Sequence, residues 1–293
     1  MSESPTLKIL LREGTALLRA AKIPAPHQTA SLLVCGILKL DHTTLIAHPE
    51  YTVSAVDAAR LRDAFSRRVQ GEPAQYLIGL QEFYGLEFKV SPAVLIPRPE
   101  TEFLVEVALE FCRHQNLTRP RIIDIGTGSG CLAVTLAVKL PAAQVLALDL
   151  SPDALAIARQ NAVTHCVADR IQFLESNYLS AVRDLPPAER VDVVVTNPPY
   201  ISQAEYADLQ REVRDFEPKM ALVGGEAGTE GYAQILADLD RVLKPDGLFA
   251  CEVGYTQAQA VAQLGQQAGW DDQRIIDDLQ GIPRVVVLRK QPL

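Results

Sequence analysis

The sequence predicts an α/β protein whose main domain is a mostly parallel sheet of seven strands with one antiparallel strand. Three observations lead to this prediction. Helical spacing without strand-like alternation fills the N-terminal part, whereas strand-like and helical segments alternate after about residue 120. The last two strand-like segments are joined by only six residues, 278–283, which is too short for a crossover helix. A length of 293 residues suits one domain of about 200 residues and a smaller one.

The N-terminal part is expected to be helical. Apolar residues recur three and four positions apart in 6–21, 27–40 and 55–70, with Pro24 and Gly71 as helix-breaking residues between or after them. These segments predict a small helical domain.

A different pattern follows between residues 82 and 99. The run 83–90 (FYGLEFKV) is short and has a central glycine, and Pro92, Pro97 and Pro99 come after it. This pattern predicts a β-hairpin and a stiff linker. We therefore predict an N-terminal domain at 1–75, a hairpin linker at 76–98 and a larger domain at 99–293.

The larger domain shows the alternation of strands and helices that is typical of a parallel sheet covered on both faces. The predicted strands are 121–125, 144–149, 171–175, 191–196, 248–253, 274–277 and 284–289, and the predicted helices are 130–140, 152–163, 229–243 and 256–268. Pro245 and Gly247 are expected to stop the third of these helices.

Composition favours a soluble cytoplasmic protein over a membrane or nucleic-acid-binding protein. No stretch reaches the roughly 20 apolar residues of a membrane helix, and no secretory signal pattern is evident. With 28 basic and 36 acidic residues the net charge is −8, which disfavours binding to phosphates. The five cysteines lack the spacing of zinc sites, so we expect no metal and interpret them as small core residues.

The first chemical motif is DIGTGSG at 124–130, where a buried strand gives way to a helix. Its glycines allow a tight turn and let a ligand approach the backbone, while the helix N-terminus offers unpaired N–H groups. Asp149 ends the next strand, 19 positions after Gly130, where a ribose-binding acid belongs. Asp149 could instead cap the following helix, but Ser151 is the better cap.

The spacing of the glycines favours a nucleoside over a pyrophosphate. A dinucleotide fingerprint would have Gly or Ala at Cys131, and no Gly-Lys-Ser/Thr of a P-loop follows the glycines. An oxidoreductase that uses a dinucleotide is therefore the weaker reading.

The second motif is NPPY at 197–200, at the carboxyl end of a predicted central strand. Two prolines stiffen the loop and leave carbonyl oxygens as free acceptors. The Asn197 side-chain oxygen and the Pro198 backbone oxygen could accept the two hydrogens of a planar –NH2 group, with its plane on the Tyr200 ring. The alternative is a rigid strand-ending turn held by Pro198 and Pro199 without chemistry.

Through these motifs the chain resembles the peptide chain release factor glutamine methyltransferases, a family of S-adenosylmethionine-dependent protein-(glutamine) methyltransferases, over its whole length. The linker 95–102 (LIPRPETE) and the segment 212–218 (EVRDFEP) also match this family. The related ribosomal-protein glutamine methyltransferases share NPPY, but their linker is expected to read Pro-Arg-Ser-Pro where this chain has PRPE at 97–100. The linker therefore favours the release-factor branch.

The resemblance implies a Rossmann-like class I methyltransferase fold and a set of cofactor contacts. It places residues of the glycine loop against the methionine part of the cofactor, namely Gly126, Thr127, Gly128, Ser129 and Gly130, with Asp149 on the ribose and Asn177 and Tyr178 at the adenine. Asn197 would contact both cofactor and substrate. Many members have Asp where this chain has Asn177, although an amide oxygen can also accept a hydrogen bond.

The sequence therefore predicts methylation of the glutamine side chain in the Gly-Gly-Gln motif of release factors during translation termination, with the N-terminal helices as docking domain. Asn197, Pro198 and Tyr200 are the expected catalytic residues, and 197–200 as a whole is expected to bind the substrate. No strong base is expected near this loop. The alternatives are methylation of an amine of adenine or guanine, which would have to be extruded from its stack, and methylation of a ribosomal-protein glutamine. A binding module that only retains the cofactor site is a further alternative.

Overall fold

The computed structural model describes residues 4–290, and its contacts divide the chain into two compact units. One unit comprises the residues up to Leu80 together with Gln210–Phe216, and the other comprises Gln81–Leu209 and the residues from Glu217 onward. The separate functions of a docking domain, a linker and a catalytic domain stay predictions.

The helical unit is built from α1 (Leu7–Ala20), α2 (Pro26–Leu38), α3 (His42–Ala47), α4 (Ala55–Val69), α5 (Ala74–Ile78) and α9 (Arg211–Phe216). The three predicted helices are confirmed with ends within two residues, whereas α3, α5 and α9 were not predicted. Side-chain caps fix where helices begin: Thr6 accepts from the Ile9 N–H of α1, and Ser54 accepts from the Asp57 N–H of α4. The apolar faces of α1, α2 and α4 meet in one hydrophobic cluster.

The larger unit contains the hairpin, except for the first residue of β1, and all strands of the main sheet. Its strands are β1 (Leu80–Phe83), β2 (Leu86–Lys89), β3 (Arg121–Ile125), β4 (Gln144–Asp149), β5 (Ile171–Glu175), β6 (Val191–Thr196), β7 (Leu243–Glu252), β8 (Asp272–Asp277) and β9 (Pro283–Arg289). Its α-helices are α6 (Glu102–His114), α7 (Cys131–Lys139), α8 (Pro152–Thr164), α10 (Glu230–Val242) and α11 (Ala258–Gln267). Short 3-10 helices lie at η1 (Pro99–Thr101), η2 (Ala168–Arg170), η3 (Pro187–Glu189), η4 (Glu205–Asp208) and η5 (Lys219–Ala221).

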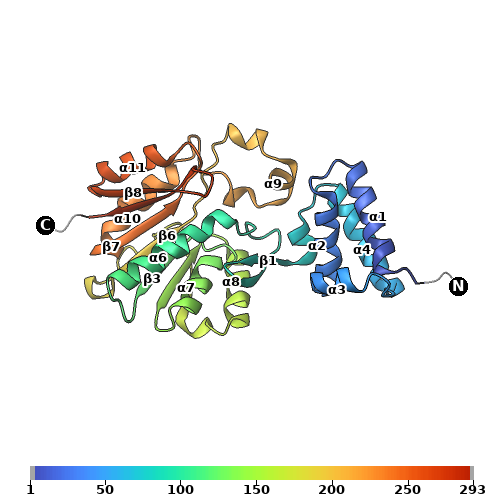
Figure 1. Ribbon diagram of the computed structural model, residues 1–293. Helices are drawn as coiled ribbons and strands as arrows, with labels where there is room; N and C mark the ends of the chain where they lie inside the picture. The colour runs from blue at the N-terminus through green and yellow to red at the C-terminus, as the bar shows by residue number, and fades with distance from the viewer. Residues whose placement is uncertain (1–3, 291–293) are drawn as a thin grey trace. The chain divides into compact units, whose positions relative to one another are not determined.

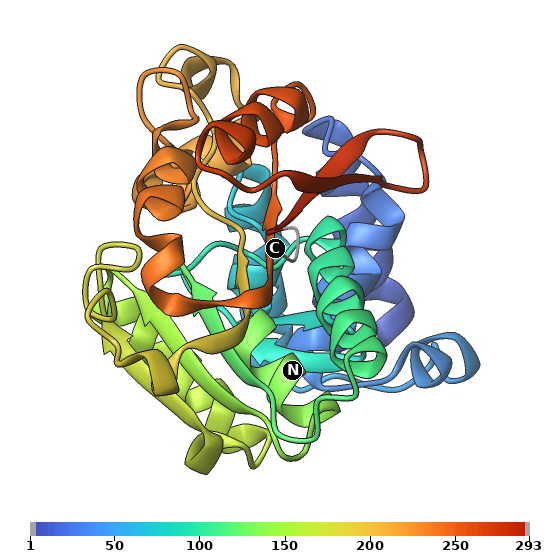
Figure 2. The ribbon, with the colours of Figure 1, turned by 90° about the vertical axis from the view of Figure 1, so that its left-hand side faces the viewer.

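The sheet has the order β5-β4-β3-β6-β7-β9-β8, with β9 antiparallel to both of its neighbours. The other neighbouring pairs are parallel. Figure 1 labels β3, β6, β7 and β8 of this sheet. Figure 2 shows β8 and β9, in dark red, at one edge of the sheet. The predicted mostly parallel sheet with one reversed strand is therefore confirmed.

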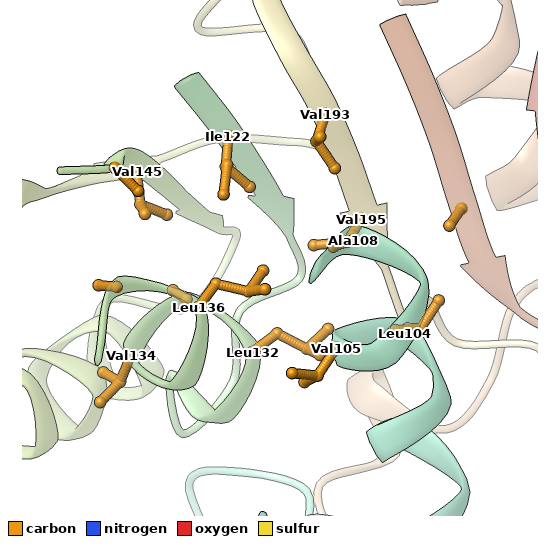
Figure 3. Close-up of a cluster of buried hydrophobic side chains, with 14 of the residues drawn as sticks. Leu104, Val105, Ala108, Ile122, Leu132, Val134, Leu136, Val145, Val193 and Val195 are labelled. Atoms are coloured by element: carbon orange, nitrogen blue, oxygen red, sulfur yellow. The ribbon is translucent and has the colours of Figure 1, made fainter. Parts of the chain in front are cut away.

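Alternation along the strands builds two apolar layers. On one face, Ile122, Val193 and Val195 of β3 and β6 pack with α6 and α7, and Figure 3 shows Leu104 and Val105 of α6 beside Leu132 of α7 in this layer. On the other face, Ile123 and Val194 pack with α10 and α11. This layering holds β3 and β6 in the middle of the sheet, so the loops at their carboxyl ends have a rigid base.

Three details differ from the sequence analysis. Helix α6 was not predicted, although its apolar residues pack against the sheet. Helix α10 ends at Val242 and β7 begins at once, so that Pro245 and Gly247 lie inside β7, beside a register shift in its pairing with β6. The prediction that all cysteines are core residues is wrong for Cys166, which is exposed.

No helix within residues 4–290 is long and apolar enough to cross a membrane.

Candidate active site

The glycine loop joins β3 to α7 in a conformation that only glycine adopts readily. Gly126, Gly128 and Gly130 have φ angles of 69°, 55° and 81°. A side chain at Gly130 would also meet the Cβ of Ala158 at 3.1 Å, so this glycine permits close packing of α7 on α8. The loop thus leaves the backbone of Gly126 and Gly128 open on its outer side while its far end packs into the protein.

Asp124 stabilises this loop from the buried side. Its side chain is fully buried, and its Oδ2 accepts hydrogen bonds from the Thr127 hydroxyl (2.6 Å) and from the Ala133 N–H (3.1 Å). Burial raises the pKa of Asp124 to about 7. Its other oxygen, Oδ1, has no hydrogen-bond partner within the described part of the chain.

Asp149 lies at the end of β4, beside the glycine loop. Its Oδ2 accepts from the Gly128 N–H (2.8 Å) and its Oδ1 from the Ser151 N–H (2.9 Å). A carboxylate can accept about four hydrogen bonds, so roughly two acceptor sites stay open. Ser151 caps α8 through the Ala154 N–H, so Asp149 is not the cap of this helix.

Asn177 and Tyr178 follow β5, the strand next to β4. Asn177 is exposed, and Tyr178 is half-buried, with its ring packed against the apolar layer under α10. Tyr178 has a φ of 49°, which is unusual for a bulky side chain and points to a conformation imposed by its surroundings. Tyr178 thus packs partly against the core and also lines the cavity described below, so its place is compatible with the expected ligand contact.

The NPPY loop follows β6 and lies beside the glycine loop. A side chain at Gly126 would be 3.9 Å from the backbone oxygen of Asn197. Asn197 is half-buried and Pro198 is buried, while Tyr200 is half-buried with a pKa raised above its ordinary value, mainly by burial. The Gln257 side chain donates to the Tyr200 backbone oxygen (2.8 Å), which ties the end of the loop to the protein.

Two residues beside Asn197 were missed in the sequence analysis. The Asn197 Nδ2 donates to the Thr101 hydroxyl oxygen (3.1 Å), and the Thr101 hydroxyl donates to Glu252 Oε2 (2.6 Å). A buried carboxyl group is therefore connected to this loop through Thr101, which the sequence pattern did not indicate; the expectation that no strong base lies near the loop stays a prediction. The available signal was Glu252 itself, an acid at the end of the apolar run 248–253.

The charges of the linker form contacts within the protein. Arg98 forms an ion pair with Glu217, whose side chain is only 1% exposed, and Glu217 also accepts from the Ile96 N–H (3.1 Å). Glu102 accepts from the Tyr84 N–H (2.8 Å) and so connects α6 to the hairpin. Glu217 was visible in the sequence only as part of the EVRDFEP segment.

One cavity gathers most of the predicted site residues at the carboxyl edge of the sheet. It is lined by residues of the glycine loop, of the ends of β4, β5 and β6, of the linker and of the segment around η5, namely Ala93, Val94, Leu95, Ile125, Gly126, Gly128, Asp149, Leu150, Ser151, Ala154, Ser176, Asn177, Tyr178, Asn197, Pro199, Pro218, Met220 and Ala221. Five predicted site residues do not belong to this lining: Thr127, Ser129, Gly130, Pro198 and Tyr200.

The residues present fit an adenosine-based methyl donor. Asp149 retains acceptor capacity for hydroxyl groups, the glycine backbone is open, and Tyr178 offers an aromatic surface in the lining of the cavity. The buried, unpartnered oxygen of Asp124 lies behind the same loop. Among the described residues, no group of three or more His, Cys, Asp or Glu side chains is placed to hold a metal ion.

Two family models match the chain in the expected order. The PrmC N-terminal domain matches residues 10–79, and the methyltransferase small domain matches residues 101–214.

Relatives and solved structures agree with this order. The release factor glutamine methyltransferase of Koribacter versatilis is 43% identical over 285 residues, which cover 97% of this chain and 99% of that protein. The protein of the same name from Nitratidesulfovibrio vulgaris is 41% identical over 98% of this chain and 96% of its own length. In three dimensions the chain is similar to the hMettl16 catalytic domain in complex with the MAT2A 3'UTR hairpin 1 (TM-score 0.58, 14% identity, 88% of this chain and 91% of the other), a likeness that shows the fold alone.

The glycine loop, the acid at the end of β4 and the NPPY loop thus share one cavity on a class I methyltransferase fold, in a chain that near-full-length relatives match at about 40% identity. The chain is therefore a member of the release factor glutamine methyltransferase family, a family of protein-glutamine N-methyltransferases.

Proposed function

We propose that this protein methylates the side-chain amide nitrogen of the glutamine in the Gly-Gly-Gln motif of peptide chain release factors, with S-adenosylmethionine as methyl donor. The observation that carries the proposal is the cavity in which Asn197 of the NPPY loop stands beside Gly126, Gly128 and Asp149. A nitrogen acceptor and a nucleoside-type donor can meet there. The names of the relatives supply the substrate.

The cofactor half of the site is formed by the ends of β3, β4 and β5. In the proposal, the glycine loop from Gly126 to Gly130 borders the methionine part, with Thr127 and Ser129 shaping the loop from its buried side. Asp149 holds the ribose with its remaining acceptor sites, and Asn177 and Tyr178 border the adenine. When bound, S-adenosylmethionine supplies an electrophilic methyl group on a positively charged sulfur.

The acceptor half is the NPPY loop. The Asn197 side-chain oxygen and the Pro198 backbone oxygen accept the two N–H hydrogens of the glutamine amide, and Tyr200 borders the amide plane. Transfer forms a bond between the glutamine nitrogen and the methyl carbon, breaks the bond from that carbon to sulfur, and releases one amide proton to water. Pro199, which cannot donate a backbone hydrogen bond, keeps this part of the loop stiff.

Placement of the amide matters more for this reaction than its activation. An amide nitrogen is a poor nucleophile because its lone pair is delocalised. Orientation in a fixed site can lower a bimolecular barrier by about 7–11 kcal/mol, whereas a single polarising contact contributes about 3–4 kcal/mol. The rigid base of the NPPY loop on β6, a strand buried throughout, fits a role in placement.

The partners and the setting follow from the same proposal. The substrate is a release factor, the helical unit serves as the docking domain, and the reaction belongs to translation termination in the cytoplasm. The net charge of −8 argues against a nucleic-acid substrate, because such proteins gain affinity by neutralising phosphates.

Mass spectrometry tests the proposal directly. An unmodified bacterial release factor, a ribosomal-protein mixture and samples of DNA and RNA are incubated with the protein and S-adenosylmethionine. A gain of one methyl group at the glutamine of the Gly-Gly-Gln peptide supports the proposal. Methylation of a base or of a ribosomal-protein glutamine, with an unmodified release factor, rejects it in favour of that substrate.

Two variants test the division of roles within the cavity. Asn197→Ala is expected to lower kcat by roughly 10²–10³-fold and to leave the dissociation constant of S-adenosylmethionine within a few fold, because it removes a contact to the acceptor. Asp149→Ala is expected to weaken cofactor binding by roughly 10–100-fold, because hydrogen bonds to charged groups contribute about 1.5–3 kcal/mol each. Methylation kinetics measure kcat, and calorimetric titration measures the affinity of both variants for the cofactor. Equal loss of cofactor affinity in the two variants contradicts the assignment.

A further inference from the structure

The side chain of Asn197 is held by a chain of two hydrogen bonds that ends at a buried carboxylate. Asn197 Nδ2 donates to Thr101 Oγ1 (3.1 Å), and the Thr101 hydroxyl donates to Glu252 Oε2 (2.6 Å). Thr101 and Glu252 are each only 2% exposed. Water therefore has little access to replace either bond.

The fold fixes the position of each member of this chain. Glu252 is the last residue of β7. Thr196 of β6 pairs with Cys251 of β7 in parallel, so the residues that follow this pair, Asn197 and Glu252, are neighbours. The Tyr232 hydroxyl donates to the Glu252 backbone oxygen (2.8 Å) and holds the end of β7. Thr101 ends η1, immediately before α6.

The directions of the two bonds determine which way the Asn197 amide faces. An ionised carboxylate only accepts hydrogen bonds, so Glu252 in its ionised form takes the single hydroxyl hydrogen of Thr101. Thr101 can then only accept from Asn197. The amide of Asn197 has one end that donates and one end that accepts, and the two ends are nearly equal in shape. Only the Nδ2 end can face Thr101, so Oδ1 must point away from it.

This orientation matters because Asn197 lines the cavity. If the amide were turned by 180°, its N–H groups would face the N–H groups of an incoming amide, and no hydrogen bond could form between them. A solvent-exposed asparagine would sample both orientations. The buried Thr101 and Glu252 remove this freedom.

We propose that Thr101 and Glu252 are positioning residues for methyl transfer, which hold the Asn197 amide with its oxygen available to the acceptor nitrogen. The inference rests on the proposed function, since it takes the acceptor to be a primary amide with two N–H donors. Neither residue needs to touch the substrate. Both act through Asn197.

Substitution of Thr101 tests this role. Thr101→Val is nearly isosteric and removes only the hydroxyl group. The substitution is expected to lower kcat by at least roughly tenfold. The loss should not exceed roughly 10²–10³-fold, which is the effect of losing a whole transition-state contact. The dissociation constant of S-adenosylmethionine is expected to stay within about twofold of the wild-type value. Thr101→Ser restores the hydroxyl and is expected to recover kcat to within a few fold of wild type.

A matched control is available at Thr135, a fully buried threonine of α7 whose hydroxyl has no hydrogen-bond partner in the described chain. Thr135→Val makes the same chemical change without touching Asn197, so it is expected to keep the wild-type kcat. This control separates the loss of a buried hydroxyl in general from the loss of this particular one.

A double-mutant cycle tests whether Thr101 and Glu252 act as one unit. Glu252→Gln gives Thr101 a neighbour that can donate as well as accept, so the direction of the chain is no longer fixed. The single variant is expected to lose kcat to about the same extent as Thr101→Val, and the Thr101→Val/Glu252→Gln double variant to lose little more than either. Independent structural damage would instead multiply the two losses.

The outcomes separate this inference from the proposed function. Wild-type protein that transfers no methyl group to a glutamine rejects the proposed function, and the positioning role with it. Transfer by the wild type together with an undiminished kcat of Thr101→Val rejects the positioning role alone. The positioning role is also rejected if Thr101→Ser is as impaired as Thr101→Val. It is rejected as well if the kcat loss of Thr101→Val comes with an equal loss of cofactor affinity.

Discussion

Glu252 is the residue whose acid–base behaviour the fold changes in a way that bears on the site. Burial raises its pKa from an ordinary 4.5 to about 7, and Glu100 acts in the same direction, while the Thr101 hydrogen bond and the charges of Arg284 and Arg98 act against it. The neighbouring tyrosines, Tyr200 and Tyr232, have pKa values raised above their ordinary 10 and stay neutral near pH 7. Glu252 therefore changes its charge in the range where the enzyme would work.

Stability and activity are expected to respond to this titration with opposite signs. Between about pH 4.5 and 7 the folded protein keeps a proton on Glu252 that the unfolded chain releases, so the free energy of unfolding falls as the pH rises, by on the order of 3 kcal/mol from this residue. The kcat is expected to rise over the same upper range, because only the carboxylate fixes the direction of the bond from Thr101. Urea unfolding and kcat are measured from pH 5 to 8.

In the pH experiment Glu252→Gln is the test variant. Glu226→Gln is the matched control, because Glu226 is exposed. The first variant should unfold with a shallower pH dependence and lose the pH-dependent rise of kcat, and the second should follow the wild type. An unchanged pH dependence in Glu252→Gln would contradict the role of this carboxyl group. Asp124, whose pKa burial also raises to about 7, should keep part of the stability slope in every variant.

At the scale of elements, the site depends on segments outside the sheet and its covering α-helices. Residues 93–95 of the linker line the cavity, as do Pro218, Met220 and Ala221 around η5. Glu217 ties these segments together, because it lies next to Pro218 and accepts from the linker at Ile96 while it pairs with Arg98. The buried side chain of Glu217 thus connects these segments, as backbone hydrogen bonds connect the strands of a sheet.

Removal of Glu217 is expected to loosen both segments. Glu217→Ala leaves the Ile96 N–H and the Arg98 guanidinium without this partner, so we expect the free energy of unfolding to fall by about 1.5–3 kcal/mol and cofactor affinity to fall by roughly tenfold. Chemical denaturation and calorimetric titration with S-adenosylmethionine measure the two effects. Glu226→Ala, at an exposed acid of the same region, is the control. Wild-type cofactor affinity in Glu217→Ala would show that the contacts of Glu217 with Ile96 and Arg98 are not needed for cofactor binding.

At the scale of the whole molecule, the two units have separate apolar cores. The helical unit is held by the cluster around α1, α2 and α4, whereas the sheet packs two layers of its own. A defect in the helical core should therefore leave the cofactor site intact. This separation allows the proposed docking function to be tested apart from the chemistry.

Gly14→Ala provides such a defect. A Cβ at Gly14 of α1 would lie 2.3 Å from Cζ of Phe65 in α4, and the Phe65 ring is buried in the same core. Alanine favours a helix by about 1 kcal/mol over glycine, but overpacking costs typically about 1–3 kcal/mol. We expect lower stability of the helical unit, unchanged cofactor affinity and slower methylation of a whole release factor.

The comparison that decides this prediction is between a whole release factor and a short Gly-Gly-Gln peptide. Kcat/KM for the peptide should stay within about twofold of wild type in Gly14→Ala, and Arg19→Ala, at an exposed position of α1, should leave both substrates unaffected. Equal losses for peptide and whole protein would argue against a docking role of the helical unit. Thermal unfolding with and without cofactor reports the stability change.

The sequence by itself determined the elements that local pattern controls. Apolar runs marked the strands 121–125, 144–149, 171–175 and 191–196, whose bounds the structure confirms. Because the carboxyl ends of parallel strands meet at one edge of a sheet, the sequence also predicted that the glycine loop, Asp149 and the NPPY loop come together. Helix α6 escaped prediction, although it is amphipathic, and β7 begins earlier than Pro245 and Gly247 suggested.

Only the tertiary structure decided how those groups are held. Thr101 lies 96 positions from Asn197 and 151 from Glu252, so no spacing rule could connect them. The hydrogen bonds form because the register of β6 and β7 and the packing of α6 bring the three residues together, and burial then raises the pKa of the acid. Sequence pattern records the local preferences of the chain, whereas the direction of a hydrogen bond and the charge of a buried group depend on neighbours that are distant along it.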